Sequence, residues 1–454
     1  MVESNYQAIG NRHNPSSKDI LNSEYIDTTL VVNDKRVKHT GMITKNYLMS
    51  HPEILSEILK DEIENDEIGK RRHDSLSNRR AAPRHRNRGY ALKEMEHLSD
   101  KEFQRMFRLN RRAFYWLLSK IHHDISPAAS LRQRVQLERN ISATIKLAVM
   151  MRWLGGGSYL DICFAFGIAV GTFYKSKGIL WGTMEAVNKF LEIGFPLHDM
   201  SRLEEISEGF SEFSHGRMKG CVMAMDGWVM KTRCPTVHEV RNQICYRNRK
   251  GVWGMVIFAG CDHKCRFTMF SAKCPGSTND CIAWEVTDLF QSVVVRDRLP
   301  GQYYFVCDEA VSANECVLSP YGGRNIGPWR DSFNYHLSAM RQTIERAFGL
   351  LTKKFGIFAR PLQCDYGRWS FIALVCAKLH NLCIDFGVEE TCGVPEDFAE
   401  GDSAEVFMNS YQEDNVGTWP TNSDNSSMKR NQICEILKQQ GYCRPSHARC
   451  NSKA

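Results

Sequence analysis

The sequence has no long apolar run. Its longest nearly apolar stretches are about ten residues, such as 252–261, whereas a membrane-spanning helix needs about 20. We therefore expect no transmembrane helix. The first thirty residues also lack an apolar signal core, which argues against secretion. The 454 residues are 43% hydrophobic and 24% charged, an average composition that excludes a wholly disordered chain, a collagen-like fibre and a long coiled coil.

Cys-x-x-Cys pairs are also missing, although the chain has 17 cysteines. The number is odd and no secretory signal accompanies it, so we expect reduced thiols in the cytosol or nucleus. Two groups, one around His263 (Cys261 and Cys265) and one around His380 (Cys376 and Cys383), leave a zinc-binding regulator open as an alternative. Their spacings do not match known zinc frameworks, which favours cysteines that act as small buried hydrophobic residues.

The net charge of +7 is unevenly distributed along the chain. Residues 70–88 hold eight basic residues and one acidic residue, and residues 387–428 hold ten acidic residues and no Lys or Arg. An acidic segment therefore masks a basic body. A basic body indicates a polyanionic partner, and we expect DNA binding that weakens steeply with salt.

Two segments differ in pattern before the midpoint of the chain. Residues 1–95 are polar and without sustained periodicity, which predicts a disordered arm that carries the basic run. This arm would neutralise phosphates or act as a nuclear import signal, with a merely solubilising arm as the alternative. Residues 96–195 show helical periodicity, with helices expected at 141–154 and 171–191.

A short helix is expected to begin at Ser158, with Asp161 as its capping partner, and to end at Gly167. The turn at 167–170 then joins it to the next helix in the manner of a helix-turn-helix, which places its second helix in the DNA major groove. An ordinary helical bundle is the alternative. Residues 169–172 offer little to read base edges, while Lys175 and Lys177 could hold phosphates.

The second half of the chain changes to a strand pattern. Apolar runs predict four strands, at 221–230, 251–261, 266–272 and 302–307. Helical patterns follow at 333–355 and 368–386. Residues 196–386 are therefore expected to form an α/β domain. We expect an acidic linker over 387–428 and a C-terminal helix within 429–454, near 431–440.

Four acidic residues occupy positions suited to a metal site. Asp226 and Asp308 each follow an apolar strand, Asp280 follows a turn that leads into a helix, and Glu345 flanks the apolar stripe of a long helix. Charged groups on buried strands are costly unless they are paired or bind a cation. Carboxylates are the preferred ligands of Mg²⁺ and Mn²⁺, and such ions support phosphoryl transfer. From spacing alone, a capping role at a strand or helix end remains open.

Five segments of the second half form a recognisable set: 222–227, 274–280, 304–308, the helix 334–353 with Glu345-Arg346-Ala347-Phe348-Gly349, and Leu379-His380-Asn381. Together they resemble the DDE endonuclease domain of PIF/Harbinger-type transposases. The resemblance implies an α/β, RNase H-like mixed sheet flanked by helices, preceded by an all-α helix-turn-helix-like domain. It implies a catalytic triad of Asp226, Asp308 and Glu345, with Asp280 as a fourth metal ligand for Mg²⁺ or Mn²⁺.

The resemblance also implies a function. The expected chemistry is metal-dependent cutting and joining of DNA in the nucleus, with a separate Myb-like DNA-binding protein as a partner and homo-oligomers left open. Arg341 and Arg346 could contact phosphate or screen the carboxylates, with a helix-surface ion pair as the alternative, and Lys353 could line the DNA path, with a merely solvated charge as the alternative. The rival hypothesis is a domesticated, catalytically silent nuclear protein of the same fold that binds DNA or chromatin.

Three residues depart from the family pattern. Trp228 stands where a small polar residue is usual, Asn279 stands where His is usual, and Glu309 adds a carboxylate beside Asp308. None of these changes removes an expected metal ligand.

Overall fold

The computed structural model describes two units, Met1–His85 and Arg86–Ala454. The described residues are three strands within 6–44 and the ranges 88–126, 141–175, 178–323, 326–388, 427–442 and 444. The basic run before Arg88, Lys177 and the acidic segment 389–426 lie outside the described residues.

The first unit contains a three-stranded antiparallel sheet. Its strands are β1 (Tyr6–Ile9), β2 (Tyr25–Val32) and β3 (Thr40–Thr44), in the order β1-β2-β3. These strands differ from the disordered arm expected over residues 1–95. The reason lies in β2, where Ile26, Thr28, Thr29, Val31 and Val32 give the branched composition that favours extended backbone.

A mixed five-stranded sheet forms the centre of the second unit, in the order β6-β5-β4-β7-β8. The strands are β4 (Cys221–Lys231), β5 (Gly254–Cys261), β6 (Phe267–Pro275), β7 (Tyr304–Val306) and β8 (Val317–Leu318). The first three strands pair antiparallel, while β7 runs parallel to β4 and β8 runs parallel to β7. All four predicted strands are confirmed, and β8 was not anticipated.

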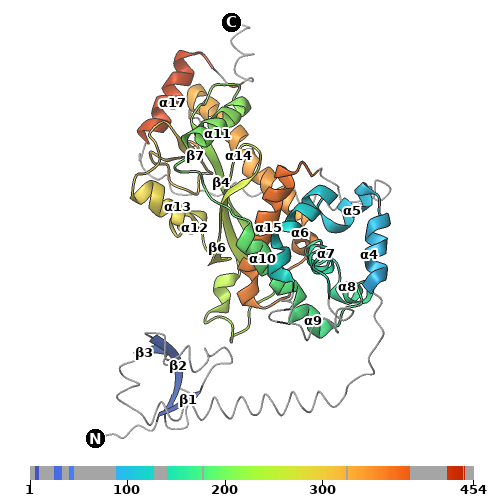
Figure 1. Cartoon of the computed structure of the whole chain (residues 1–454). Helices are drawn as coiled ribbons and strands as arrows, with labels where there is room; N and C mark the ends of the chain where they lie inside the picture. Colours follow the sequence, from blue (N-terminus) through green and yellow to red (C-terminus); the bar gives the residue numbers. More distant parts are fainter. Residues whose placement is uncertain are drawn as a thin grey trace, which may run out of the picture. The chain divides into compact units, whose positions relative to one another are not determined.

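Helices cover both faces of this sheet (Figure 1). On one face, α14 (Pro328–Lys354) packs its Phe348 ring 5.7 Å from Trp228 of β4. On the other, α12 (Asp280–Glu285) packs Trp284 6.0 Å from Phe258 of β5. Trp228 pairs with Ile257, the residue before Phe258. Successive residues of a strand point to opposite faces of the sheet, so the contacts of Trp228 and Phe258 lie on opposite faces. The expected mixed sheet flanked by helices is confirmed, and it is compatible with an RNase H-like fold.

Two further helices lie beside α14. α11 (Met200–Phe213) contacts β4 and α14, and α15 (Tyr366–Asp385) contacts β6 and α14. α13 (Asp288–Phe290) follows α12.

The apolar stripe of α14 holds the helix against the sheet. Its members are all buried: Leu337, Met340, Ile344, Phe348 and Leu351. Burial of such side chains stabilises a fold by about 1.5–3 kcal/mol each. Because α14 has 27 residues, it is about 40 Å long and crosses the sheet. This stripe was predicted in full from the sequence.

A helical part precedes the sheet. Its helices are α4 (Arg88–His97), α5 (Asp100–Phe107), α6 (Arg111–Ile125), α7 (Ala143–Leu154), α8 (Tyr159–Ala165), α9 (Val170–Tyr174) and α10 (Ile179–Phe190). Ser99 and Glu102 form a capping box at the start of α5. α10 contacts α15, which joins this part to the sheet.

Two details of the helical part were predicted wrongly. The single helix expected over 171–191 is divided into α9 and α10, and Gly178, the N-cap of α10, passes so close to Thr172 that an added Cβ would lie 2.6 Å from its carbonyl oxygen. The capping partnership of Ser158 and Asp161 is not formed, since the Ser158 side chain makes no cap hydrogen bond. The two short helices around the turn are present, but α9 has only five residues.

The last described element is α17 (Met428–Gln439), which packs against α14. This confirms the predicted C-terminal helix. Within the described ranges, no helix combines the length and the apolar character that crossing a membrane requires.

Candidate metal centre

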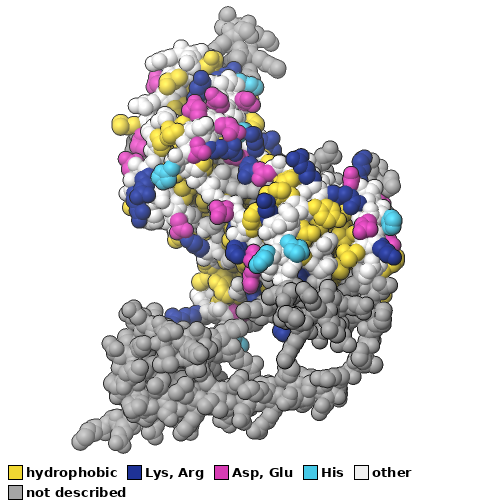
Figure 2. Space-filling model, viewed as in Figure 1, with side chains coloured by type: hydrophobic (Ala, Val, Ile, Leu, Met, Phe, Trp, Pro, Cys, Tyr) yellow, Lys and Arg dark blue, Asp and Glu magenta, His cyan; other side chains and the backbone are white. Residues whose placement is uncertain are grey.

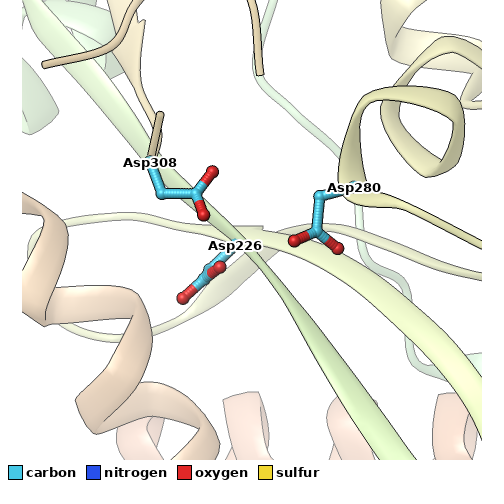
Figure 3. Close-up of side chains that lie close together, drawn as sticks. All are labelled: Asp226, Asp280 and Asp308. Atoms are coloured by element: carbon cyan, nitrogen blue, oxygen red, sulfur yellow. The ribbon is translucent and has the colours of Figure 1, made fainter. Parts of the chain in front are cut away.

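Three aspartates from three different elements lie close together beside the middle of β4 (Figure 3). Asp226 belongs to β4, Asp308 follows β7 by two residues, and Asp280 is the first residue of α12. One carboxylate oxygen of each lies within 4.8 Å of the others. β4 and β7 run parallel and their last pair is Ala224 with Val306, so Asp226 and Asp308 each lie two residues beyond that pair and come together.

The pairing of the strands explains why the cluster forms at this point. β7 pairs with β4 only as far as Val306 opposite Ala224. Beyond that point the β7 side of β4 is open, so Asp308 and Asp280 can approach Asp226.

Gly227 is the residue that gives Asp280 its space. A Cβ at Gly227 would lie 1.9 Å from Asp280 Oδ1, a distance that no real contact allows. Any side chain here would force the Asp280 carboxylate away from the cluster. The sequence contained Gly227 within the matching segment 222–227, but no pattern in the sequence indicated this role.

The turn before α12 fixes the direction of Asp280. Asn279 is the N-cap of α12, and its Oδ1 accepts a hydrogen bond from the Ile282 amide at 2.9 Å. Asn is a strong capping residue, which gives a physical role to the position that departs from the family's usual His. Asp280 therefore projects from the first turn of the helix.

The cluster has more negative charge than its surroundings balance. Burial, followed by the charge of Asp308, raises the pKa of Asp226 to about 8, against the opposing charge of Arg341. Burial and the charge of Asp308 raise the pKa of Asp280 to about 6, and burial raises the pKa of Asp308 as well. Three half-buried carboxyls held at raised pKa values are typical of a site that takes a cation or protons.

Arg341 links this cluster to Glu345. Its guanidinium donates to Asp226 Oδ2 at 3.3 Å and to Glu345 Oε1 at 2.6 Å. Glu345 is not part of the group of three, and its side chain is 47% exposed. The structure thus brings three of the four predicted acids together and connects the fourth through Arg341. Of the roles considered for Arg341, these contacts fit the screening of the Asp226 carboxylate and an ion pair along the helix with Glu345.

The remaining predicted DNA contacts lie at the surface. Arg346 is exposed and stacks over the Phe213 ring at 5.3 Å, Lys353 is exposed near the end of α14, and Lys175 is exposed after α9. Their roles toward DNA stay predictions.

The other two departures from the family pattern lie away from the three carboxylates. Trp228 is buried between Phe348 and Phe358, with ring centroids at 5.7 and 5.4 Å. Glu309 is exposed and its Oε1 lies beside Gly322, where a Cβ would be 2.5 Å away. Trp228 therefore contributes to packing, and Glu309 does not join the cluster.

The Leu-His-Asn segment has a structural role that the sequence did not indicate. Asn381 accepts from the Phe267 amide and donates to the Phe267 carbonyl, both at 2.8 Å. His380 Nε2 lies 2.8 Å from the Cys265 carbonyl oxygen, and burial lowers the pKa of His380 to about 4. These bonds tie α15 to β6, so this histidine, one of the two considered for zinc, contacts backbone.

Comparison with known proteins identifies the sheet part of the chain. Residues 225–381 match the family model described as DDE superfamily endonuclease. The chain is 25% identical over 300 residues to the Arabidopsis thaliana protein named ALP1-like, covering 63% of this chain and 71% of that protein.

Two further relatives have similar coverage. The candidate nuclease HARBI1 of Rattus norvegicus is 21% identical over 304 residues, covering 65% of this chain and 81% of its own length. The Arabidopsis thaliana protein named Antagonist of Like Heterochromatin Protein 1 is 23% identical over 304 residues, covering 63% and 74%. These matches confirm the resemblance to PIF/Harbinger-type DDE endonucleases. No solved structure matches the chain.

Proposed function

We propose that this chain, whose residues 225–381 match the DDE superfamily endonucleases, is a metal-dependent endonuclease that cuts and joins DNA by phosphoryl transfer. The observation that carries the proposal is the convergence of Asp226, Asp280 and Asp308, whose carboxylate oxygens lie within 4.8 Å of one another. Three half-buried carboxylates with one arginine leave a net negative site, and a divalent cation is the simplest group that would neutralise it.

The residues present fit Mg²⁺ or Mn²⁺, which prefer carboxylate oxygens. Asp226, Asp280 and Asp308 would hold the ion, and Glu345 would complete the ligand set with the triad partners Asp226 and Asp308. A bound divalent ion supplies charge neutralisation and polarises phosphate oxygens. Water would be the first nucleophile and a DNA 3′-hydroxyl the second.

Arg341 orients two of the four acids. Its bonds to Asp226 and Glu345 span from β4 to α14, so it sets the relative position of the strand acid and the helix acid. Its positive charge also lowers the cost of assembling the carboxylates before any DNA is present.

The test is Mg²⁺- or Mn²⁺-dependent nicking of supercoiled plasmid and of labelled duplexes by the purified full chain. We expect Asp308→Ala to abolish nicking. Asp288→Ala is the matched control, because Asp288 follows α12 closely but its side chain is 97% exposed, and we expect wild-type activity from it. Loss of activity in both variants would contradict the assigned site.

The rival function is DNA or chromatin binding without catalysis. It is favoured by relatives whose printed names do not mention nuclease activity, such as ALP1-like. Wild-type protein that binds DNA but nicks no duplex, with either metal and across candidate terminal sequences, would decide for this rival.

We further propose a nuclear location and a separate Myb-like DNA-binding partner. α9, the helix that follows the turn, has five residues. The segment from Ala169 to Thr172 at its start is poor in groups that read base edges. Strong sequence-selective binding of terminal repeats by the pure chain alone would contradict the need for such a partner.

A further inference from the structure

The connection between β4 and β5, residues 232–253, is unusually basic. We call it the β4–β5 arm. It contains five Lys or Arg residues and one acid, Glu239. In Figure 1 it is the yellow-green segment at one end of the sheet. On the face drawn in Figure 2, by contrast, basic and acidic side chains are interspersed.

At the base of the arm, its one acidic residue, Glu239, is held in an ion pair with Arg233. Arg233 and Glu239 form a two-pronged ion pair, with Arg233 Nη1 2.8 Å from Glu239 Oε2 and Nη2 bonded to Oε1. The pair with Arg233 lowers the pKa of Glu239 to about 2. Glu239 also accepts from the Tyr366 amide at 3.0 Å, which anchors the arm to the start of α15.

The tip of the arm is a tight turn over residues 248–251. Asn248 Oδ1 accepts from the Val252 amide at 2.9 Å, and Gly251 has a φ of +77°. Asn at the first position and Gly at the last are typical of such turns. Arg249 occupies a central position of the turn, where the side chain is exposed.

The arm is hydrogen-bonded to the segment that leads into Asp280. The Ser277 amide donates to the Cys245 carbonyl at 2.9 Å, and Gly276 packs so closely on the Tyr246 carbonyl that a Cβ would be 2.8 Å from its oxygen. The charge of Arg249 opposes the rise in the pKa of Asp280 that burial and Asp308 cause. The arm therefore lies beside the carboxylate cluster.

Three arginines of the arm are left without a balancing charge. Arg241, Arg247 and Arg249 are exposed, and within the described ranges none of them forms an ion pair. Surface guanidinium groups of this kind bind phosphate and release counterions from DNA.

We propose that the β4–β5 arm binds the phosphate backbone of DNA next to the carboxylate cluster, with Arg247 and Arg249 as phosphate contacts. This inference rests on the proposed function for the choice of DNA as the polyanion. The carboxylate cluster repels phosphate, so a rigid basic element beside it supplies the local attraction that brings a phosphodiester close. The contacts are to the backbone and carry no sequence preference.

The experiment measures binding of the full chain to a fluorescein-labelled duplex by anisotropy, in EDTA, over a range of salt concentrations. The charge-removing variant is Arg247→Gln with Arg249→Gln. We expect about tenfold weaker binding near 0.1 M salt, and a slope of log K against log salt that is smaller by about 2, one per lost phosphate contact.

The matched control is Arg296→Gln with Arg298→Gln. These two arginines have the same spacing and are exposed, but they precede β7 and so lie at the opposite end of that strand from Asp308. We expect wild-type affinity and slope. Equal weakening in the two double variants, or wild-type binding by Arg247→Gln with Arg249→Gln, would overturn the inference.

A charge-keeping variant separates binding from folding. Arg247 Nε donates to the Gly251 carbonyl at 3.2 Å, so its replacement could disturb the turn. Arg247→Lys with Arg249→Lys removes that bond and keeps both charges, and we expect it to retain most of the affinity; loss equal to that of the Gln variant would overturn the inference. Because binding is measured without metal, wild-type protein that binds but never nicks would contradict the proposed nuclease alone.

Discussion

Two aspartates at neighbouring strands of the same sheet, Asp262 just after β5 and Asp226 on β4, have opposite surroundings. Asp262 follows β5, and its side chain is fully buried. Its Oδ1 accepts from the amides of Lys264 and Arg266 at 2.9 and 3.0 Å, and its Oδ2 lies 3.3 Å from Arg202. Asp226 on β4 instead faces two other carboxyls and shares its one arginine with Glu345.

The difference separates a structural acid from a candidate functional one. A buried carboxylate that accepts enough hydrogen bonds and lies near cations offsets the free-energy cost of its burial and stabilises the fold. A carboxylate whose neighbours are other carboxylates cannot do so without a further cation or bound protons. Burial alone therefore does not distinguish the two acids; the shortage of positive charge around Asp226 does. Five predictions test this contrast, from the largest expected effect to the smallest.

Asp226→Asn removes one negative charge from the cluster and should lower the nicking rate about a thousandfold, or ~4 kcal/mol. The free energy of unfolding in metal-free buffer should not decrease, because a neutral amide is easier to bury than a carboxylate. Plasmid nicking and urea denaturation measure the two quantities. Marked destabilisation without loss of nicking would reverse the assignment of this acid.

Asp262→Ala should show the opposite behaviour. It removes the acceptor of two backbone amides and the partner of Arg202, so we expect a loss of about 3 kcal/mol in the free energy of unfolding. Urea denaturation measures it. Any nuclease activity should persist at temperatures well below the lowered midpoint, and an unchanged midpoint would mean that this acid is not structural.

The stability of the metal-free protein should fall as pH rises. The pKa of Asp226 is raised to about 8 and that of Asp280 to about 6, whereas an unfolded Asp titrates near ~4. Between pH ~4 and pH ~8 the folded state binds more protons than the unfolded state. The contribution of these two groups to the free energy of unfolding is therefore full below pH ~4 and is lost as pH rises through their folded pKa values.

A bound divalent metal ion should restore the stability that the protein loses at high pH. At pH 8, Mn²⁺ at about thirty times its Kd should stabilise the protein by about 2 kcal/mol, seen as a higher Tm than in EDTA. The gain should shrink at pH 6, where protons compete for the same carboxylates. If Asp226→Asn shows the same metal-induced rise in Tm as wild type, the ion binds elsewhere.

Gly227→Ala should have the smallest effect and a local one. The added Cβ would displace the Asp280 carboxylate, and we expect metal affinity about tenfold weaker by titration calorimetry, or ~1.4 kcal/mol. Gly349→Ala is the control, because a Cβ there meets no atom within 4 Å. In a helix, this control should raise stability by up to about 1 kcal/mol without changing metal affinity.

The sequence predicted the sheet domain better than the geometry of its site. Apolar runs such as that before Asp226 exist because strands covered on both faces must be apolar throughout, and the stripe on α14 follows from helical periodicity. These signals are local, so the strands and α14 were found with small errors at their ends.

Features that depend on contacts between distant segments were not predictable. At Gly178, between α9 and α10, the backbone passes close to another segment of the chain. The space left by Gly227 matters only once Asp280 packs against it. The separation of Glu345 from the three aspartates depends on how Arg341 lies between α14 and β4. A sequence pattern contains none of these distances.

The bonds of Asn381 have a consequence for self-association. β6 is an edge strand, and such strands expose amide and carbonyl groups that can pair with another molecule. The Asn381 carboxamide satisfies both outward groups of Phe267 in the way that a sixth strand would. A single side chain from α15 therefore blocks part of the edge against sheet extension between copies of the chain.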